Sequence, residues 1–346
     1  MSKRVKIGNI YVGGGEKIAI QSMSIYKLSN TSECIKEADL LEKAGCDIMR
    51  YSVLDEVDAK SFNMLKKHTK MPLVADIHFD YKLALLSIDG GADKIRINPG
   101  NIGSDQKVSE VAKAIKQNGV AVRVGSNTGS IDKEFLDKYG KNEISLGESA
   151  LKNVAILEKH GVENIVVSVK ASSVPLMIKA YEYLSKRIDY PLHLGVTEAG
   201  TEYVGLVKNS IGIGSLLSRG IGDTIRVSLS AEPIREVKCA KAILRSLGLI
   251  EEGVEIIACP TCGRCEWACM DMAKKVEEYL DGVKSSIKIA VMGCVVNGPG
   301  EAKDADLGVA GGKDKCVIFK KGEIIKTVEK KDVELEFFKE IDKCIR

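Results

Sequence analysis

Residues 94–125 read Lys-Ile-Arg-Ile-Asn-Pro-Gly-Asn-Ile-Gly-Ser-Asp-Gln-Lys-Val-Ser-Glu-Val-Ala-Lys-Ala-Ile-Lys-Gln-Asn-Gly-Val-Ala-Val-Arg-Val-Gly. The segment begins with a short β-branched run, Lys94–Asn98, and continues into an amphipathic stretch, Ser109–Asn118. Gly119 follows the last helical position, where a left-handed glycine commonly ends a helix. A second apolar run, Val120–Gly125, comes next. The segment therefore predicts a strand, a helix and a second strand.

The same alternation extends through the first 250 residues. The runs expected to be strands are Ile18–Met23, Asp47–Val53, Leu73–Phe79, Lys94–Asn98, Val120–Gly125, Ile165–Lys170, Leu192–Thr197 and Asp223–Ser228. Helices are expected after them, for example at Thr31–Ala44, Ala59–His68, Ser109–Asn118, Glu148–His160 and Glu232–Leu247. Eight consecutive units of this size match a (β/α)₈ TIM barrel. An open doubly wound sheet shares the local pattern but rarely needs eight units, so the barrel is favoured.

Two further segments of the barrel have expected roles. Lys6–Ile20, with Gly13–Gly15 at its middle, predicts a hairpin that covers the barrel floor. The interval Ser126–Leu146 is longer than the others and predicts a long loop over the top. A Gly-x-Gly pair can mark a phosphate-binding loop, but Gly212 and Gly214 fall within a helical pattern, so they are a weak signal for such a loop.

The alternation stops near residue 250, which divides the chain into an expected barrel domain, 1–250, and a smaller α+β domain, 251–346. The expected elements of the smaller domain are strands at Ile256–Ala258 and Ile287–Met292, a helix at Trp267–Leu280, a strand pair around Cys316–Thr327 and a final helix at Val333–Ile345. Its loops hold five of the ten cysteines, between residues 259 and 294. We therefore expect the smaller domain to be an iron–sulfur domain.

Composition excludes several classes of protein. No apolar run reaches the roughly 18 residues of a membrane-spanning helix. The net charge is only +3, and no Lys/Arg block or series of stacking aromatic residues suggests nucleic acid binding. The first residues lack the apolar core of a signal peptide. We expect a cytoplasmic protein, in which free cysteines rather than disulfides are typical.

Charged side chains stand at the predicted strand ends, where a TIM barrel builds its active site. Five cations end five different strands: Arg50, Arg96, Arg123, Lys170 and Arg226. The other polar groups at these ends include Asp76, His78, Asn98, Asn127, His193, Thr197, Glu198 and Ser228. Any single cation could belong to a structural ion pair, but too few carboxylates are present to neutralise five. Because guanidinium groups match phosphate oxygens, we expect a phosphate-bearing small molecule, most simply a diphosphate.

The cysteines of the smaller domain suggest a metal centre. Cys259 and Cys262 form a Cys-x-x-Cys pair, while Cys294 precedes Glu301 by seven residues across a Gly-Pro-Gly turn. Three thiolates and one exchangeable oxygen ligand would hold an iron–sulfur cluster with one accessible iron. The run from Cys259 through Cys262 and Cys265 to Cys269 also fits ferredoxin spacing, although the usual proline is absent and the helix expected from residue 264 would carry the last two thiols. A zinc ribbon lacks its second Cys-x-x-Cys.

These motifs resemble the GcpE (IspG) family of bacterial 4-hydroxy-3-methylbut-2-enyl diphosphate synthases. The resemblance lies in Ala258–Arg264 and Met292–Ala302 of the smaller domain, and in Ala75–Asp80, Lys94–Asn101, Val169–Ser172, His193–Gly200 and Gly222–Leu229 of the barrel. It covers almost the whole chain. This chain departs from the family pattern at Cys265 and Cys269, at Ser24–Lys27, and at Ser126 and Thr128.

The resemblance implies an oxidoreductase of isoprenoid biosynthesis. Its cofactor would be a [4Fe–4S] cluster on Cys259, Cys262 and Cys294, with Glu301 as the exchangeable fourth ligand. The substrate would be 2-C-methyl-D-erythritol 2,4-cyclodiphosphate, opened reductively with loss of water. Electrons would come from ferredoxin or flavodoxin. A homodimer is also implied, with the barrel of one subunit facing the cluster domain of the other.

Roles for the barrel residues follow from this reaction. The clamp for the diphosphate would consist of Arg50, Arg96, Asn98, Arg123, Asn127, Lys170, Arg226 and Ser228. Glu198 would protonate the departing hydroxyl, with His193 and Asp76 as orienting partners. Two other classes remain as alternatives: a pterin-binding synthase barrel, which would not need the cluster domain, and an electron-transfer protein, which would leave the strand-end cations unexplained.

Overall fold

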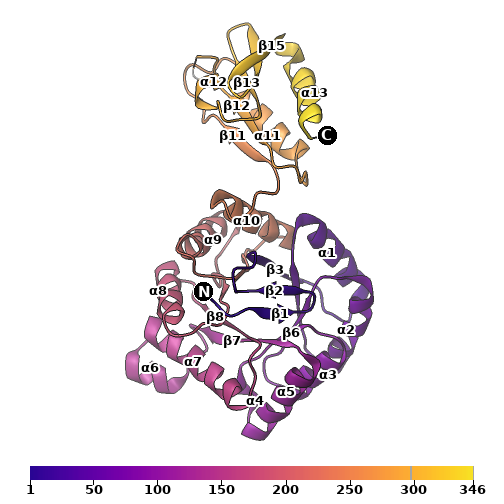
Figure 1. The fold of residues 1–346 in the computed structure, drawn as a ribbon, viewed down its shortest axis with the longest axis vertical. Helices are drawn as coiled ribbons and strands as arrows, with labels where there is room; N and C mark the ends of the chain where they lie inside the picture. Colours follow the sequence, from indigo (N-terminus) through magenta and orange to yellow (C-terminus); the bar gives the residue numbers. More distant parts are fainter. Residues whose placement is uncertain (297, 346) are drawn as a thin grey trace. The chain divides into compact units, whose positions relative to one another are not determined.

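The computed structural model describes residues 1–296 and 298–345. The chain divides into two compact units, Met1–Ile250 and a second that begins at Glu251. Each unit has its own buried apolar core. Figure 1 shows the helices and strands of both units.

The first unit is a barrel of eight parallel strands. They are β3 (Ala19–Met23), β4 (Ile48–Ser52), β5 (Leu73–Asp76), β6 (Lys94–Arg96), β7 (Ala121–Asn127), β8 (Ile165–Lys170), β9 (His193–Leu194) and β10 (Thr224–Ile225). Neighbours in the sheet follow chain order, and β10 pairs with β3. A parallel bridge between Val167 and Leu192 joins β8 to the start of the β9 segment. An open doubly wound sheet would not pair its last strand with its first, so the predicted TIM barrel is confirmed.

Helices surround the strands on the outside (Figure 1). They are α1 (Thr31–Ala44), α2 (Glu56–His68), α3 (Tyr81–Asp89), α4 (Pro99–Ile102), α5 (Asp105–Asn118), α6 (Lys133–Tyr139), α7 (Glu143–Lys159), α8 (Val174–Ser185), α9 (Glu202–Leu217) and α10 (Pro233–Ser246). Gly45 and Gly119 end α1 and α5 in the left-handed conformation, as the sequence predicted. Within the two described ranges, every helix is too short or too polar to cross a membrane.

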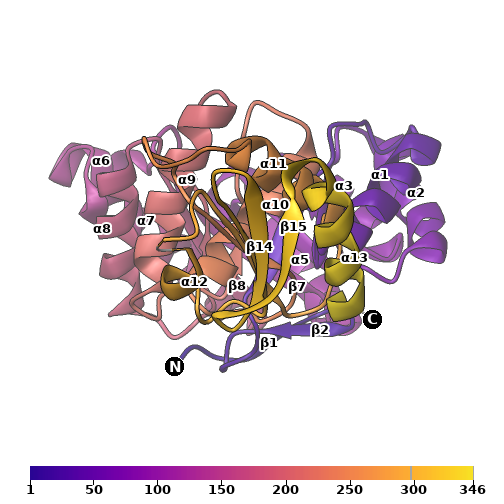
Figure 2. The same cartoon turned by 90° about the horizontal axis from the view of Figure 1, so that it is seen from above.

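A hairpin closes the floor of the barrel. Strands β1 (Val5–Ile7) and β2 (Ile10–Val12) pair antiparallel and lie at one end of the barrel in Figure 2. Their buried side chains pack against residues from the amino-terminal halves of the barrel strands, such as Ile48 and Val74. The predicted cover is therefore present. Its turn was misplaced, because it lies at Gly8 and Asn9 rather than at Gly13–Gly15, which follow the hairpin.

The interval Ser126–Leu146 is not the long loop that the sequence predicted. Strand β7 extends to Asn127, and the interval then contains α6 and the start of α7. Asp132 and Asn142 cap these helices by accepting hydrogen bonds from backbone N–H groups. The two caps were the missed signal, because Asp and Asn before a charged helical turn are typical helix starts.

The second unit is a five-stranded sheet with two main helices. Its elements are β11 (Glu255–Ala258), α11 (Cys269–Tyr279), β12 (Lys288–Met292), α12 (Gly298–Glu301), β13 (Leu307–Gly311), β14 (Lys315–Lys320), β15 (Glu323–Glu329) and α13 (Val333–Ile345). The first three strands in sheet order run parallel and the last two are antiparallel. The prediction missed β13. It also began the helix too early, at Trp267, whereas α11 begins at Cys269.

Candidate functional site

A polar cavity of about 180 Å³ lies at the carboxyl ends of the barrel strands. Eight predicted site residues line it: Arg50, Asp76, Arg96, Arg123, Asn127, Lys170, Arg226 and Ser228. The five cations come from five strands, so parallel strand direction alone brings them to one end. Arg50, Arg123 and Lys170 are at most 7% exposed, which makes this a desolvated cluster of like charges.

Asp76 is the main counter-charge inside the cavity. Arg96 donates a hydrogen bond from Nη1 to Asp76 Oδ1 at 3.1 Å, and Arg50 Nε lies 3.7 Å from Oδ2. Burial by itself raises the pKa of Asp76, but the neighbouring guanidinium groups, led by Arg50, lower it to a net value below the ordinary 3.8. Asp76 therefore carries its negative charge throughout the neutral pH range.

A second carboxylate, Glu236 of α10, faces Arg226 at 3.7 Å. Together Asp76 and Glu236 leave the five cations with an excess of positive charge. Polar atoms are also left over, since Arg123 Nη1 and Arg226 Nε are buried and have no hydrogen-bond partner in the described residues. Buried donors without acceptors are costly, so the cavity is built for an anionic ligand with several oxygen acceptors.

Three predicted site residues do not line this cavity. Asn98 caps α4, where its side chain accepts a hydrogen bond from Gly100 N at 3.1 Å. His193 is fully buried and its Nδ1 lies 2.6 Å from Thr224 Oγ1. Glu198 is exposed, although its neighbour Thr197 lines the cavity. The backbone of Glu198 has a φ of 52°, an uncommon conformation for a residue other than glycine.

Several cavity residues were not among the predicted ligands. His78 lines the cavity, and a ring nitrogen lies 3.1 Å from Arg96 Nη1. Thr197 and Ser168 also line it. Glu236, which pairs with the cavity residue Arg226, was not predicted because it belongs to a helix. The sequence did contain a signal for Ser168. Side chains alternate along a strand, and Ser168 lies two residues before Lys170, so both lie on the same face.

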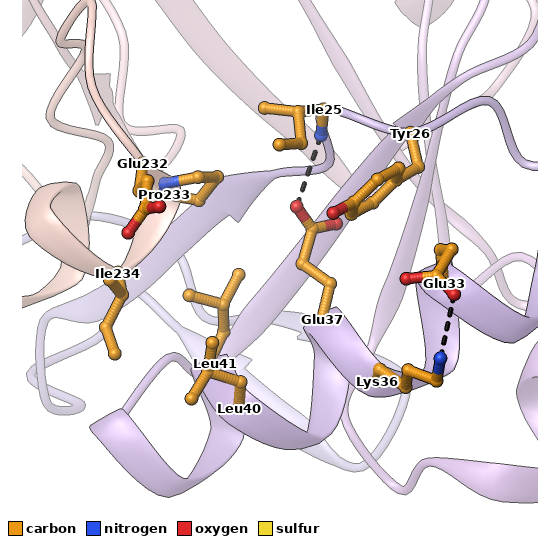
Figure 3. Close-up of a pocket in the computed structure, with 10 residues that line it drawn as sticks. All are labelled: Ile25, Tyr26, Glu33, Lys36, Glu37, Leu40, Leu41, Glu232, Pro233 and Ile234. Carbon is orange, nitrogen blue, oxygen red and sulfur yellow. Dashed lines mark hydrogen bonds and ion pairs between the residues drawn. The ribbon is translucent and has the colours of Figure 1, made fainter.

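Another cavity of the barrel unit, of about 220 Å³, lies between α1, the loop that precedes it and the start of α10 (Figure 3). Its walls combine apolar residues with Glu33, Glu37 and Glu232 and a single cation, Lys36. Lys36 pairs with Glu33 at 2.8 Å, and Glu37 accepts a hydrogen bond from Ile25 N at 3.3 Å (Figure 3). The net negative charge of this cavity would repel a diphosphate, which leaves the barrel mouth as the candidate anion site.

In the second unit, the predicted metal ligands follow two adjacent parallel strands. Ala258 of β11 is in register with Val291 of β12, so Cys259 and the Gly293–Cys294 pair leave the sheet at the same edge. Cys259 N donates a hydrogen bond to Val291 O at 2.9 Å. Glu301 ends the short helix α12 that begins at Gly298.

The backbone around these thiols is constrained. A Cβ on Gly293 would stand 3.3 Å from both Cys259 Sγ and Cys265 Sγ, so a side chain there would crowd two sulfurs. Thr261, between the paired cysteines, has a φ of 60°, which is strained for a β-branched residue. Such strain is concentrated at binding sites.

The five thiols of this region are not alike. The side chain and backbone N–H of Arg264 hydrogen-bond the exposed Cys262 thiol and lower its pKa, which favours the thiolate that a metal requires. Burial raises the pKa of Cys269 to about 12, so this residue stays a neutral thiol. Its sulfur is 3.6 Å from Val291 O. Cys265 lies outside the helix, next to Cys259 and Gly293.

Within the described residues, no three His, Cys, Asp or Glu side chains are grouped closely enough to hold a metal ion. Cys259, Cys262, Cys294 and Glu301 stay a prediction as ligands of a metal centre. Cys259 and Cys294 follow the adjacent strands β11 and β12.

A TIM barrel with a cation-lined mouth, followed by a separate domain with cysteines at its strand ends, defines the class of protein. The family within this class follows from comparison. The GcpE TIM-barrel domain matches residues 2–241, and the GcpE protein C-terminal domain matches residues 255–343. The chain belongs to the GcpE family and is an enzyme, as the sequence predicted.

Relatives from several bacteria support this assignment over the full length. A protein of Caldanaerobacter subterraneus subsp. tengcongensis is 51% identical, with 100% of this chain and 98% of that protein covered. One of Clostridium perfringens is 52% identical, with 99% and 98% covered. Both are named 4-hydroxy-3-methylbut-2-en-1-yl diphosphate synthase (flavodoxin).

Solved structures of lower similarity share the barrel. A dihydropteroate synthase from Xanthomonas albilineans superimposes with a TM-score of 0.52 at 10% identity, covering 71% of this chain and 98% of that one. A sialic acid synthetase from Leptospira borgpetersenii gives 0.51 at 14% identity, with 81% and 98% covered. Identities this low indicate a common fold and nothing about substrate.

Proposed function

We propose that this enzyme converts 2-C-methyl-D-erythritol 2,4-cyclodiphosphate into 4-hydroxy-3-methylbut-2-enyl diphosphate, by two-electron reductive ring opening with loss of water. The observation that supports this most directly is the cavity lined by five strand-end cations, in a chain whose full-length relatives bear the name of this synthase. Neither a pterin synthase nor a simple electron-transfer protein explains both features.

The barrel residues have defined tasks in this reaction. Arg50, Arg96 and Arg123 would bind the diphosphate oxygens, with Lys170 and Arg226 completing the clamp. The diphosphate gains charge when the ring oxygen leaves, and preorganised cations stabilise that charge without rearrangement. Asn127 and Ser228 line the same cavity and can hydrogen-bond substrate oxygens. Asp76 would hold Arg50 and Arg96 in position.

A [4Fe–4S] cluster would be bound by Cys259, Cys262, Cys294 and Glu301. When bound, it supplies the two electrons one at a time from flavodoxin, the donor in the relatives' names, or from a ferredoxin. Glu301 would be the exchangeable ligand of the cluster, because a carboxylate is held less tightly than a thiolate.

Glu198 is the residue that we propose to protonate the departing hydroxyl. It is exposed and follows Thr197, a residue of the cavity wall. Its positive φ costs free energy that a role at the site would justify. Asn98, which caps α4, would support the loop that follows Arg96 rather than bind substrate directly.

The active form is proposed to be a cytoplasmic homodimer, with the barrel of one subunit and the cluster domain of the other completing each active site. This proposal rests on the family resemblance. It requires the barrel mouth of one subunit to meet the cysteine-bearing loops of its partner. Experiments on the assembly in solution can test this.

Turnover of the cyclodiphosphate by anaerobically reconstituted enzyme tests the function. Reduced flavodoxin or dithionite provides the electrons, and the product is identified by mass spectrometry. About four iron and four sulfide per subunit are expected. Reconstituted protein with a full cluster and no turnover would overturn the proposal. A barrel that forms pteroate without any cluster would favour the pterin synthase alternative, and electron transfer without turnover would favour an electron carrier.

A further inference from the structure

The barrel interior beneath the cation-lined cavity is unusually polar. TIM barrels usually fill this space with branched apolar side chains, and this one does so in part, with Ile48 and Val74. Other strands place polar groups there: Gln21, Lys94, His193 and Thr224 are all at most 2% exposed. Lys94 is two residues before Arg96 on β6, so it shares the inward face and lies about 6–7 Å deeper along the strand.

Lys94 is a buried amine with no counter-ion. Its Nζ donates one hydrogen bond, to Gln21 Oε1 at 2.9 Å, and within residues 1–296 and 298–345 no carboxylate reaches it as an ion-pair partner. The charged or titratable groups that face it or stand above it are Arg50 of β4, Asp76 of β5, Arg96 of β6, Arg123 of β7, Lys170 of β8, His193 of β9, Arg226 of β10 and Glu236 of α10. Most of these are cations.

This environment disfavours the charged form of Lys94 while the cavity is empty. Burial lowers the pKa of Lys94 well below its ordinary value, and Arg123 and Arg50 lower it further. A buried lysine without an anion commonly gives up its proton. A diphosphate in the cavity would bring several negative charges to within two strand positions of Lys94 and reverse this balance.

We propose that Lys94 is a positioning residue that takes up a proton when a diphosphate enters the cavity, so that anion binding and protonation of the barrel interior are coupled. The proposal rests on the proposed function, which supplies the diphosphate. It explains why a lysine occupies a place where an apolar side chain would pack at lower cost. Lys94 would add positive charge below the bound anion without crowding the cavity, and Gln21 would hold it in place.

The alternative is a lysine that only fills space. Lys94→Met leaves the buried Gln21 Oε1 without its donor, so a loss of stability is expected for either role. The affinity for diphosphate separates the two roles: we expect about tenfold weaker binding by Lys94→Met. A packing role would leave the affinity unchanged.

Calorimetric titration with inorganic pyrophosphate, in pairs of buffers that differ in ionisation enthalpy, measures both affinity and proton uptake. Pyrophosphate titrates in the same pH range, so the proton uptake of each variant is compared with that of the wild type. At some pH between about 6 and 9, Lys94→Met should take up about one proton fewer than the wild type. His193→Gln, which changes the other buried titratable group, should keep the uptake. A conservative Lys94→Arg substitution, which carries a permanent charge, should restore affinity without restoring uptake.

The outcomes are distinct. Proton uptake equal to that of the wild type in either Lys94→Met or Lys94→Arg, at every pH in this range, overturns the inference. Loss of uptake in His193→Gln but not in Lys94→Met assigns the proton to His193 and also overturns it. If pyrophosphate does not bind at all, the proposed diphosphate site itself fails.

Discussion

Gly195 lies directly under the ammonium group of Lys170: a Cβ at position 195 would stand 3.1 Å from Lys170 Nζ and 2.7 Å from the carbonyl oxygen of Arg226. The absence of a side chain at Gly195, directly after β9, thus makes room for a cation on β8. The backbone carbonyl cannot move away as a flexible side chain could, so this glycine fixes the height at which Lys170 enters the cavity.

Gly195→Ala should therefore displace Lys170 and distort the segment that carries Arg226. We expect a loss of about 1–3 kcal/mol in the free energy of unfolding and at least tenfold weaker pyrophosphate binding. Urea denaturation and calorimetric titration measure these. Gly214→Ala in α9 is the matched control, because a Cβ there meets nothing within 4 Å. Equal effects of the two substitutions would contradict the role given to Gly195.

Asp76→Asn should destabilise the ligand-free protein, and a bound anion should restore part of the lost stability. The substitution leaves Arg50 and Arg96 without their carboxylate, and breaking a buried ion pair costs about 3–5 kcal/mol. Pyrophosphate should recover part of this loss, because it supplies negative charge to the same cations. Thermal unfolding with and without pyrophosphate measures both effects. Asp132→Asn, at an exposed pair with Lys152, should change stability by only about 0.5 kcal/mol.

Acidification should lower the free energy of unfolding, because the imidazole of His193 is buried. Burial, followed by the charge of Lys170, lowers its pKa well below 6.5 in the folded chain. The unfolded chain binds a proton below this pH whereas the folded chain does not, so stability falls as pH decreases. We expect His193 to contribute a slope of about 0.7 kcal/mol per pH unit at pH 6.5, rising to about 1.4 more than one unit below it, measured by urea denaturation. His193→Gln should lower the slope by this amount, while His68→Gln, at an exposed position, should leave it unchanged.

Substitutions of the proposed cysteine and glutamate ligands should have different effects on cluster binding and on activity. Cys294→Ala is expected to lose the cluster, whereas Glu301→Ala should keep it and lose most activity. Iron and sulfide analysis with visible absorbance on anaerobic protein measures the first property, and the turnover assay the second. Cys265→Ala should retain the cluster, as should Cys316→Ala, whose thiol is buried in the domain core. Cluster loss in Cys265→Ala equal to that in Cys294→Ala would support the ferredoxin-like ligand set instead.

Mixing two inactive variants tests the dimer. A barrel variant, Lys170→Ala, and a cluster variant, Cys294→Ala, each lack one half of the active site. If every site combines two subunits, random mixed dimers contain one intact site, and the equimolar mixture should regain about a quarter of wild-type activity. Sites formed within one subunit would leave the mixture inactive. Sedimentation analysis of each variant confirms that both still assemble.

Much of the barrel could be predicted because its signals are local. An apolar run and an amphipathic stretch recur eight times, several units end on a glycine, and each unit indicates its own secondary structure. The cations at the strand ends could be predicted to meet, because parallel strands in a barrel end at one face. Strand β13, whose Gly308 and Gly311 weaken its strand pattern, and helix α6, recognisable mainly by its cap, could not be assigned with the same signals.

The sequence by itself determined the fold class, the composition of the barrel mouth and the pairs of motifs that carry the cysteines. Only the tertiary structure decided which polar residues share the cavity: it admitted His78 and Ser168, turned Asn98 to a helix cap and buried His193 against Thr224. It also decided that Lys94 lies without a counter-ion beneath five other cations. Residue type and spacing specify on which strand a group lies, whereas its depth and neighbours depend on strand register and on long-range packing, which a one-dimensional pattern does not contain.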